Sequence, residues 1–299
     1  MNSHVDCIAC IINKANQLAD KYIQDKKVKY EFMNKVLLEV TQIKYSKTAP
    51  YLCARVMRIL QDMTGIEDFY EEEKNLFNKK LLSMETDIKK SLLDSQNRFL
   101  DAIKIAMAGN VVDFGALDDI SIELVEEIIS KSLKTELSLD VYEKLNQQLS
   151  SAQVLLYIGD NTGEIVFDKI FIEEIYNKYK DLEIYFATRG KPALNDATEK
   201  DAYFIGIDKY AKIINNGTDI PGTDLEEVSD DFKKIYYNKA DVIISKGQGN
   251  FETLLGCGDN IFYLLLCKCS MLSERLNIDR FQPIFLYEMD VDSKDFDII

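Results

Sequence analysis

The sequence predicts an α/β protein in which a mainly parallel sheet flanked by helices follows an all-helical N-terminal domain. Up to about residue 149, apolar residues recur at helical spacing and glycine is scarce. From Gln153 onward, short β-rich runs alternate with helical segments, the pattern of βαβ units in a parallel sheet. The pattern changes without a flexible linker, so we expect domains at 1–150 and 151–299 that share a firm interface.

The helical half is predicted from its apolar periodicity, with Pro50 in the early helical position that proline tolerates. The expected helices cover residues 7–23, 30–43, 50–63, one bent helix or two helices within 67–107, then 121–134 and 139–149.

The second half is predicted from short runs of β-branched and aromatic residues separated by helical segments. The expected strands are 154–158, 183–188, 212–215, 241–245, 261–266 and 283–287. The expected helices are 164–179, 197–203, 225–238, 251–255 and a short one near Met271.

Composition limits the function classes. A net charge of -15 over 299 residues argues against a protein that binds nucleic acid by neutralising its phosphates. The longest apolar run, 261–267, has the length of a strand and is too short to span a membrane. The N-terminus lacks the basic segment of a signal peptide, so we expect a cytoplasmic protein.

The chain has a single histidine, His4, near its N-terminus. This argues against Ser-His-Asp or Cys-His catalysis and against zinc sites built from histidine. Acid-base or metal chemistry must therefore use carboxylates, amides, lysines or thiols. Oxygen ligands favour a hard divalent cation, Mg²⁺ or Mn²⁺ first, with Co²⁺ or Ni²⁺ as substitutes.

Cys7 and Cys10 have the spacing of half a zinc site or of a redox pair. Both lie at the start of an expected helix, and the interpretation that we favour is that they are buried and inert. A zinc site would need two further ligands, and the thiol candidates are Cys53 or the pair Cys267 and Cys269.

Polar residues follow three of the expected strands. Asp160 and Asn161 follow the first, Asp196 lies beyond the second, and Lys246 follows the fourth. Because ligands bind at the carboxyl ends of parallel strands, we expect these four side chains to meet around a cation and an anion. The alternative is turn and capping chemistry, with Asp160 to Gly163 as a turn and Asp196 as a helix N-cap.

The loop after the fourth strand, 246–252, has the composition of a phosphate-binding loop. Gly247 and Gly249 allow close backbone approach, and Lys246 adds a positive charge. The lysine precedes the glycines, which distinguishes this loop from the Walker pattern.

Three segments together resemble the signature loops of the damage-control phosphatases, a family first catalogued as domain of unknown function eighty-nine. They are Gly159-Asp160-Asn161-Thr162-Gly163-Glu164, Arg189-Gly190-Lys191-Pro192 with Asn195-Asp196, and Lys246-Gly247-Gln248-Gly249-Asn250-Phe251-Glu252. The Cys7 and Cys10 pair resembles the N-terminal pair of the prokaryotic, single-domain branch, and 108–115 resembles a further family loop.

The resemblance implies a helical domain packed on a Rossmann-like α/β domain, with a divalent metal (Mn²⁺, Co²⁺, Ni²⁺ or Mg²⁺) bound by Asp160, Asn161 and Asp196. It implies that Lys246 lies near the substrate phosphate and that Asn110 and Asp113 lie near the substrate pocket. The other substrate-binding residues that we predict from the loops are Glu164, Arg189, Gly247, Gly249, Asn250 and Glu252.

We therefore expect a metal-dependent phosphatase that hydrolyses small phosphorylated metabolites, with Asp160, Asn161, Asp196 and Lys246 as catalytic residues. The family also contains proteins described as acidic-residue methyltransferases, so a carboxyl methyltransferase that uses S-adenosylmethionine is one alternative. A non-catalytic binder of phosphorylated metabolites is another. The sequence does not indicate the oligomeric state or the physiological substrate.

Overall fold

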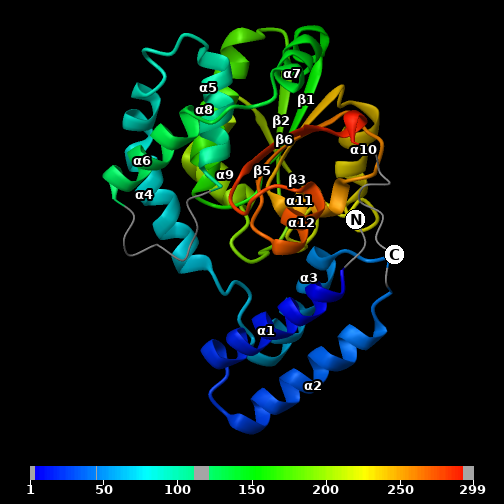
Figure 1. Cartoon of the computed structure of the whole chain (residues 1–299). Helices are drawn as coiled ribbons and strands as arrows, with labels where there is room; N and C mark the ends of the chain where they lie inside the picture. The colour runs from blue at the N-terminus through cyan, green and yellow to red at the C-terminus, as the bar shows by residue number, and fades with distance from the viewer. Residues whose placement is uncertain (1–3, 45, 111–120, 292–299) are drawn as a thin grey trace.

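The computed structural model of the chain describes residues 4–44, 46–110 and 121–291. Helices and strands alternate in the second half, and seven helices lie before the first strand within the described ranges (Figure 1). The helices are α1 Val5–Tyr22, α2 Lys26–Gln42, α3 Ala49–Thr64, α4 Glu71–Lys90, α5 Arg98–Ala108, α6 Ile122–Leu133, α7 Leu139–Ser151, α8 Glu164–Lys178, α9 Glu199–Ile205, α10 Asp230–Asn238, α11 Gln248–Leu254 and α12 Ser270–Leu276. The strands are β1 Val154–Ile158, β2 Glu183–Thr188, β3 Lys212–Asn215, β4 Val242–Lys246, β5 Ile261–Leu266 and β6 Pro283–Tyr287.

The strands form one six-stranded sheet in the order β3-β2-β1-β4-β5-β6. All neighbouring pairs are parallel except β5 and β6, which are antiparallel. The predicted α/β fold class with a mainly parallel sheet is therefore confirmed. Because strand order reverses between β1 and β4, the crevice at their carboxyl ends is the expected ligand site.

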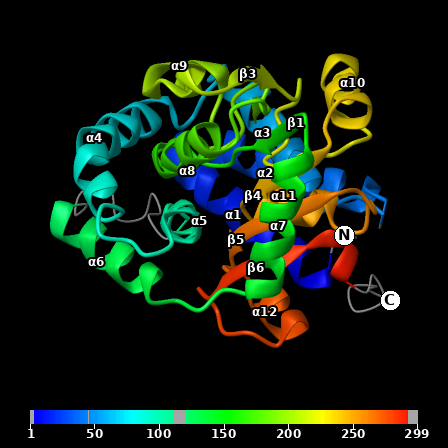
Figure 2. The same ribbon diagram turned by 90° about the horizontal axis from the view of Figure 1, so that it is seen from above.

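Helices cover both faces of the sheet, with α4, α5, α6 and α8 on one side and α10 and α11 on the other (Figure 2). Alternate residues of β1 supply the two cores: Leu155 and Tyr157 belong to the core under α8, whereas Leu156 and Ile158 belong to the core under α11. This alternation follows from the two-residue period of a strand. β1 is thus buried on both faces, which gives the residues that follow it a rigid base.

The N-terminal helices divide into two groups. α1, α2 and α3 surround a core of their own that includes Leu18, Phe32 and Leu60, whereas α4 to α7 share a core with the sheet. We call residues 5–64 the lobe and the rest the body. The change of sequence pattern near residue 150 therefore marks where strands begin, while the separation between cores lies after Phe69, in the segment between α3 and α4.

Three predicted helix starts in the second half were wrong, and one of them, expected at Phe251, lies at Gln248. The helix expected at 225–238 begins at Asp230, because Ser229 Oγ accepts the Phe232 N–H and caps it. The helix expected at 197–203 begins at Glu199, and Thr198 caps it together with Asp201.

No described helix is long and apolar enough to cross a membrane.

Candidate functional site

The segment after β1 is held against the segment after β2 by backbone hydrogen bonds. Ala197 N–H donates to Asp160 O at 2.8 Å, and Thr162 N–H donates to Asn195 O at 2.9 Å. An isolated antiparallel bridge joins Asn161 to Asp196. The structure thus brings Asp160, Asn161 and Asp196 together although the two aspartates come from different loops of the chain.

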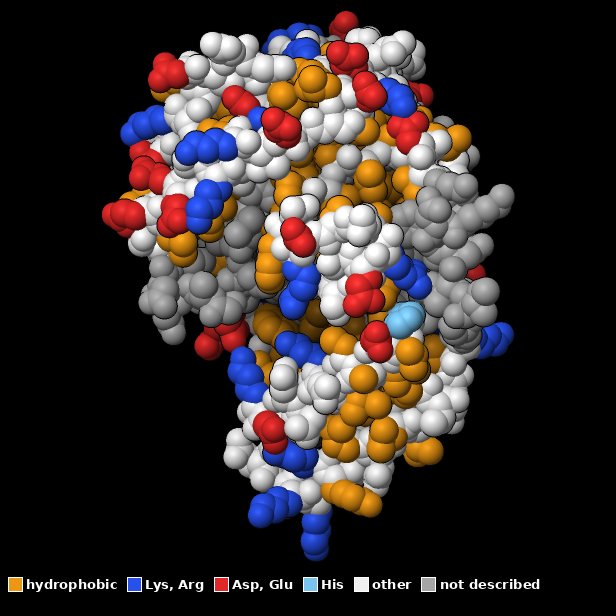
Figure 3. Space-filling model, in the orientation of Figure 1, with side chains coloured by type: hydrophobic (Ala, Val, Ile, Leu, Met, Phe, Trp, Pro, Cys, Tyr) orange, Lys and Arg blue, Asp and Glu red, His pale blue; other side chains and the backbone are white. Residues whose placement is uncertain are grey.

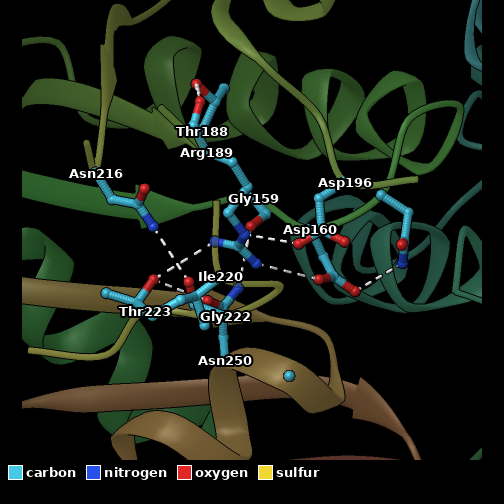
Figure 4. A network of polar contacts seen from close by, with 12 residues as sticks. Gly159, Asp160, Thr188, Arg189, Asp196, Asn216, Ile220, Gly222, Thr223 and Asn250 are labelled. Atoms are coloured by element: carbon cyan, nitrogen blue, oxygen red, sulfur yellow. Dashed lines mark hydrogen bonds and ion pairs between the residues drawn. The ribbon is translucent and has the colours of Figure 1, made fainter. Parts of the chain in front are cut away.

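The guanidinium of Arg189 faces both carboxylates from one side (Figure 4). Its Nε donates to Asp196 Oδ2 at 2.6 Å, and its Nη2 lies 3.4 Å from Asp160 Oδ1. Its Nη1 reaches Thr223 Oγ1 at 3.5 Å. Since Arg189 is only 1% exposed, it fixes both aspartates from behind.

Asn161 connects this pair to a second group of charges. Its Nδ2 donates to Asp160 Oδ2 at 2.7 Å and to Glu164 Oε2 at 3.1 Å. Asn110 from the end of α5 also donates to Glu164. Asn161 Oδ1 is the atom of this amide that could bind a cation.

Lys246, the last residue of β4, is fully buried beneath Glu164. Its Nζ donates to Glu164 Oε1 at 2.7 Å, to Asp168 Oδ1 at 2.5 Å and to Ala106 O at 2.9 Å. These three bonds match the three N–H groups of an ammonium. Lys246 therefore holds carboxylates, and in this structure it does not reach the space where a substrate could bind.

These side chains form what we call the buried charge network. Each member is less than a tenth exposed, and the members are Asp160, Glu164, Asp168, Arg189, Asp196 and Lys246. Four carboxylates face two cations, so the network carries two excess negative charges when all its members are ionised. Buried charges without partners are costly, and this excess matches the charge of one divalent cation.

The pKa shifts reflect the same imbalance. Burial raises the pKa of Asp160 well above its ordinary value, and the charges of Asp196 and Glu164 raise it further. Burial also raises the pKa of Asp196 although Arg189 opposes the shift. At Glu164, burial is outweighed by Lys246, so the pKa is lowered. The neighbouring cations therefore do not compensate for the burial of the Asp160 and Asp196 carboxylates, whereas Lys246 does compensate for the burial of Glu164.

The Lys246 end of the network contains one further partner. Tyr157 Oη donates to Asp168 Oδ1 at 2.7 Å, while Asp168 Oδ2 is buried and has no hydrogen-bond partner in the described chain. Burial raises the pKa of Asp168 to about 6.

Gly247 is required by the position of Asp160. Its φ is +79°, and a Cβ at this position would lie 1.9 Å from Asp160 Oδ2. The backbone of the loop thus approaches the carboxylate more closely than a side chain would permit.

Replacing Gly247 by alanine is expected to lower the free energy of unfolding by about 2–3 kcal/mol and to displace the Asp160 carboxylate. Gly256→Ala is the matched control, because Gly256 has a φ of +87° and no neighbouring atom lies within 4 Å of the place that a Cβ would take. Urea unfolding of both variants measures the difference. Equal losses would show that backbone strain alone matters and that the contact with Asp160 does not.

A cavity of about 560 Å³ lies between the lobe and the body. Figure 3 shows the surface hollowed between these two parts. The predicted site residues that line it are Asn110, Asp160, Asn161, Asp196, Gly249 and Glu252. Those absent from its lining are Glu164, Arg189, Lys246, Gly247 and Asn250, and Asp113 lies outside the described residues.

Asn250, in the first turn of α11, has a structural role. Its Nδ2 donates to Gly159 O at 3.0 Å and to Lys246 O at 2.7 Å, and its Oδ1 accepts from Thr223 Oγ1 at 2.8 Å. Asn250 thereby ties the end of β1 to the end of β4.

The cavity wall also contains residues that the sequence analysis did not assign to the site. Lys268 and Arg280 are its basic side chains. Burial raises the pKa of Asp160, and the positive charge of Lys268 partly offsets this rise. Lys268 alone had a sequence signal, because it lies just after the strand at 261–266, where ligands gather in parallel sheets.

The capping interpretation of the acidic residues was wrong. Gly163 is the N-cap residue of α8 and no side chain caps that helix, while Thr198 occupies the N-cap position before α9. The side chains of Asp160 and Asp196 bind Arg189 instead.

A cation at this site would depend on few protein ligands. Within the described residues, no three His, Cys, Asp or Glu side chains are grouped as a metal site. Asp160 and Asp196 would therefore act together with the Asn161 amide and water, a set of oxygen donors that suits Mg²⁺ or Mn²⁺.

Comparison with known proteins gives concordant matches. The model of the damage-control phosphatase ARMT1-like domain matches residues 3–282. Damage-control phosphatase PH1575 of Pyrococcus horikoshii is 35% identical over 283 residues, which cover 94% of this chain and 96% of that protein. A damage-control phosphatase of Archaeoglobus fulgidus is 29% identical over 235 residues, 77% of this chain and 79% of that protein. A crystal structure of the DUF89 family protein PH1575 superposes with a TM-score of 0.87 and 32% identity, covering 96% of this chain and 99% of that one.

Proposed function

The chain belongs to the damage-control phosphatase ARMT1-like family, and on this premise we propose that it is a metal-dependent phosphatase that hydrolyses phosphate monoesters of small metabolites. The observation that carries the metal dependence is the buried charge network, which has two excess negative charges and whose members Asp160 and Asp196 share one cation, Arg189, and line the cavity. The names of the relatives support phosphatase activity toward damaged metabolites.

The residues present fit a divalent cation. Asp160 and Asp196 would bind it through carboxylate oxygens and Asn161 through Oδ1, while Arg189 holds the carboxylates in place from behind. When bound, such an ion polarises a phosphoryl oxygen and lowers the pKa of a coordinated water. Gly247 contributes by letting the loop backbone approach Asp160.

The size and charge of the cavity support a small phosphorylated substrate. About 560 Å³ falls within the range of pockets that bind small molecules. Lys268 and Arg280 are positioned to contact a phosphate from the cavity wall, and Asn110 and Glu252 to contact hydroxyl groups of the rest of the substrate.

Lys246 has a supporting role in this proposal. By holding Glu164 it fixes the carboxylate that accepts from Asn161, and so it determines where the Asn161 amide lies. This role differs from direct contact with the substrate phosphate, which the resemblance implied.

The six free cysteines fit a cytoplasmic enzyme, since that compartment keeps thiols reduced.

Removing divalent ions with a chelator should abolish phosphate release, and adding Mn²⁺, Co²⁺, Ni²⁺ or Mg²⁺ should restore it. The reason is that Asp160 and Asp196 share only Arg189, so the negative charge that remains at the cavity repels the substrate phosphate. Phosphate release from a generic monoester such as a sugar phosphate measures this. Activity that persists in full after chelation would refute the metal dependence, and tight retention of a phosphate ester without any release would indicate a binding protein instead.

A further inference from the structure

The cavity has a wall of thiols that the proposed reaction does not use. Four of the six cysteines line the cavity. Cys7 and Cys10 belong to α1, Cys53 belongs to α3, and Cys269 directly precedes α12. They come from three separate parts of the chain, and all are free thiols. The same cavity is lined by Asp160, so the thiols and the candidate catalytic carboxylate share one space.

Cys7 and Cys10 are the pair whose spacing is fixed by secondary structure. Together with Ile11 they form one stripe of α1, at positions i, i+3 and i+4, and all three residues line the cavity. Side chains three residues apart on a helix have their Cβ atoms about 5–6 Å apart. A disulfide requires roughly 3.5–4.5 Å. Joining these thiols therefore draws the N-terminal turns of α1 together by about 1–2 Å.

The N-terminal turns of α1 are suited to such a change. Cys7 N–H bonds to His4 O at 3.0 Å, and Val5 and Ile8 are exposed, so few packed side chains resist a local tightening. Ile11, by contrast, is buried in the lobe core and anchors the continuing helix.

The two thiols differ in exposure. Cys10 is exposed, whereas Cys7 is half-buried. Burial raises the pKa of Cys7, and the neighbouring Glu252, Cys269 and Cys10 raise it further. An oxidant from solution therefore meets Cys10 first, and Cys7 is the neighbouring thiol that can react with the product.

We propose that Cys7 and Cys10 are a reversible oxidation site whose disulfide reshapes the cavity and suppresses catalysis. In the first step Cys10 Sγ attacks a hydroperoxide, the O–O bond breaks, and a sulfenic acid and one molecule of water or alcohol result. In the second step Cys7 Sγ attacks the sulfenic sulfur, the S–S bond forms, and the hydroxyl group leaves with the Cys7 proton as water. The two thiols lose two electrons in total, and the hydroperoxide accepts them.

A bound soft metal ion is the competing use of these thiols. Because no three described His, Cys, Asp or Glu side chains are grouped as a metal site, the arrangement does not favour it. A disulfide needs only two thiols, and α1 supplies both. The effect on catalysis rests on the proposed phosphatase activity, whereas formation of the disulfide does not.

The test oxidises the full-length protein with hydrogen peroxide, removes the peroxide, and maps disulfides by mass spectrometry under non-reducing conditions. We expect a bond between Cys7 and Cys10 that a phosphine reductant reverses. Phosphate release, measured after metal is added, should fall roughly tenfold or more on oxidation and recover on reduction. In Cys7→Ser and in Cys10→Ser, peroxide treatment should change the rate of phosphate release by less than about twofold.

Matched controls separate this pair from the other thiols. Cys53→Ser, Cys269→Ser and the distant Cys257→Ser should keep the response of the unaltered protein to peroxide. A disulfide that maps to Cys53 or Cys269, or none at all, would overturn the assignment.

A measurement that does not depend on catalysis separates the proposed oxidation site from the proposed phosphatase activity. The rate at which iodoacetamide alkylates Cys53, which lines the same cavity, should change by more than about twofold when the disulfide forms. If phosphate is never released but this change and the disulfide are found, the phosphatase proposal fails and the oxidation site stands. If the disulfide forms and neither Cys53 reactivity nor activity changes, control of the cavity is refuted.

Discussion

Replacing Lys246 by methionine is expected to lower the free energy of unfolding by about 3–5 kcal/mol. The substitution keeps the aliphatic volume but removes the cation that Glu164 and Asp168 share, together with the bond to Ala106 O. Asp168 already has one buried oxygen without a partner in the described chain, so no nearby group replaces the lost cation. Urea unfolding followed by circular dichroism measures the loss.

Two variants make the Lys246 result interpretable. Lys234→Met removes a surface lysine that pairs with exposed Asp231 and should change stability by less than about 0.5 kcal/mol. Adding Asp168→Asn to Lys246→Met should recover part of the loss, because it neutralises one of the two stranded carboxylates. A loss below about 1 kcal/mol would mean that the ion pairs contribute little to folding.

Asp160→Asn is expected to reduce kcat/KM for phosphate release by about 10³-fold or more. The amide keeps the size of the side chain and removes a negative charge from the proposed metal site. Steady-state assays at saturating Mn²⁺ measure the effect. Asp181→Asn, at an exposed position before the start of β2 and thus at the opposite edge of the sheet from the site, should leave activity unchanged within about twofold.

Stability should respond to Asp160→Asn in the opposite way. The pKa of Asp160 is raised by burial and then by Asp196 and Glu164, so the ionised carboxylate is disfavoured where it lies. A neutral amide relieves this repulsion, and the thermal midpoint without metal should stay equal or rise. A variant that loses activity by unfolding would not test the proposal, and a stable variant with full activity would refute it.

The sheet could be predicted from the sequence because each strand is a short apolar run with clear ends. β1, β2, β3, β5 and β6 begin and end at the predicted residues, and β4 differs by one residue at each end. The predicted convergence of Asp160 and Asp196 depended only on strand adjacency, and β1 does pair with β2. Parallel pairing then places the two loops on the same edge of the sheet.

The direction of individual side chains could not be predicted in the same way. Lys246 ends β4, and whether its side chain faces a ligand or the protein interior depends on α5 and α8, which pack on that face. The sequence showed a lysine before two glycines and suggested an exposed phosphate contact. The acceptors that bury it, Ala106 O and Asp168, lie far away along the chain and became visible only in the fold.

The cysteines illustrate the same limit. Cys7 and Cys10 could be paired by spacing, but Cys53 and Cys269 reach the cavity through the placement of the lobe against the body. Such contacts between separate cores leave no periodic signal. Arg280 reaches the cavity because the segment before β6 lies beside the end of β5, an arrangement that the sequence pattern did not show.

The lobe has its own apolar core and supplies one wall of the cavity, whereas the buried charge network belongs wholly to the body. Apart from Cys7 and Cys10, the residues of α1 and α3 that line the cavity can therefore change without disturbing the buried charge network. We expect relatives that accept different metabolites to have diverged most on that surface, so that new specificities evolve by remodelling one wall around an unchanged reaction centre.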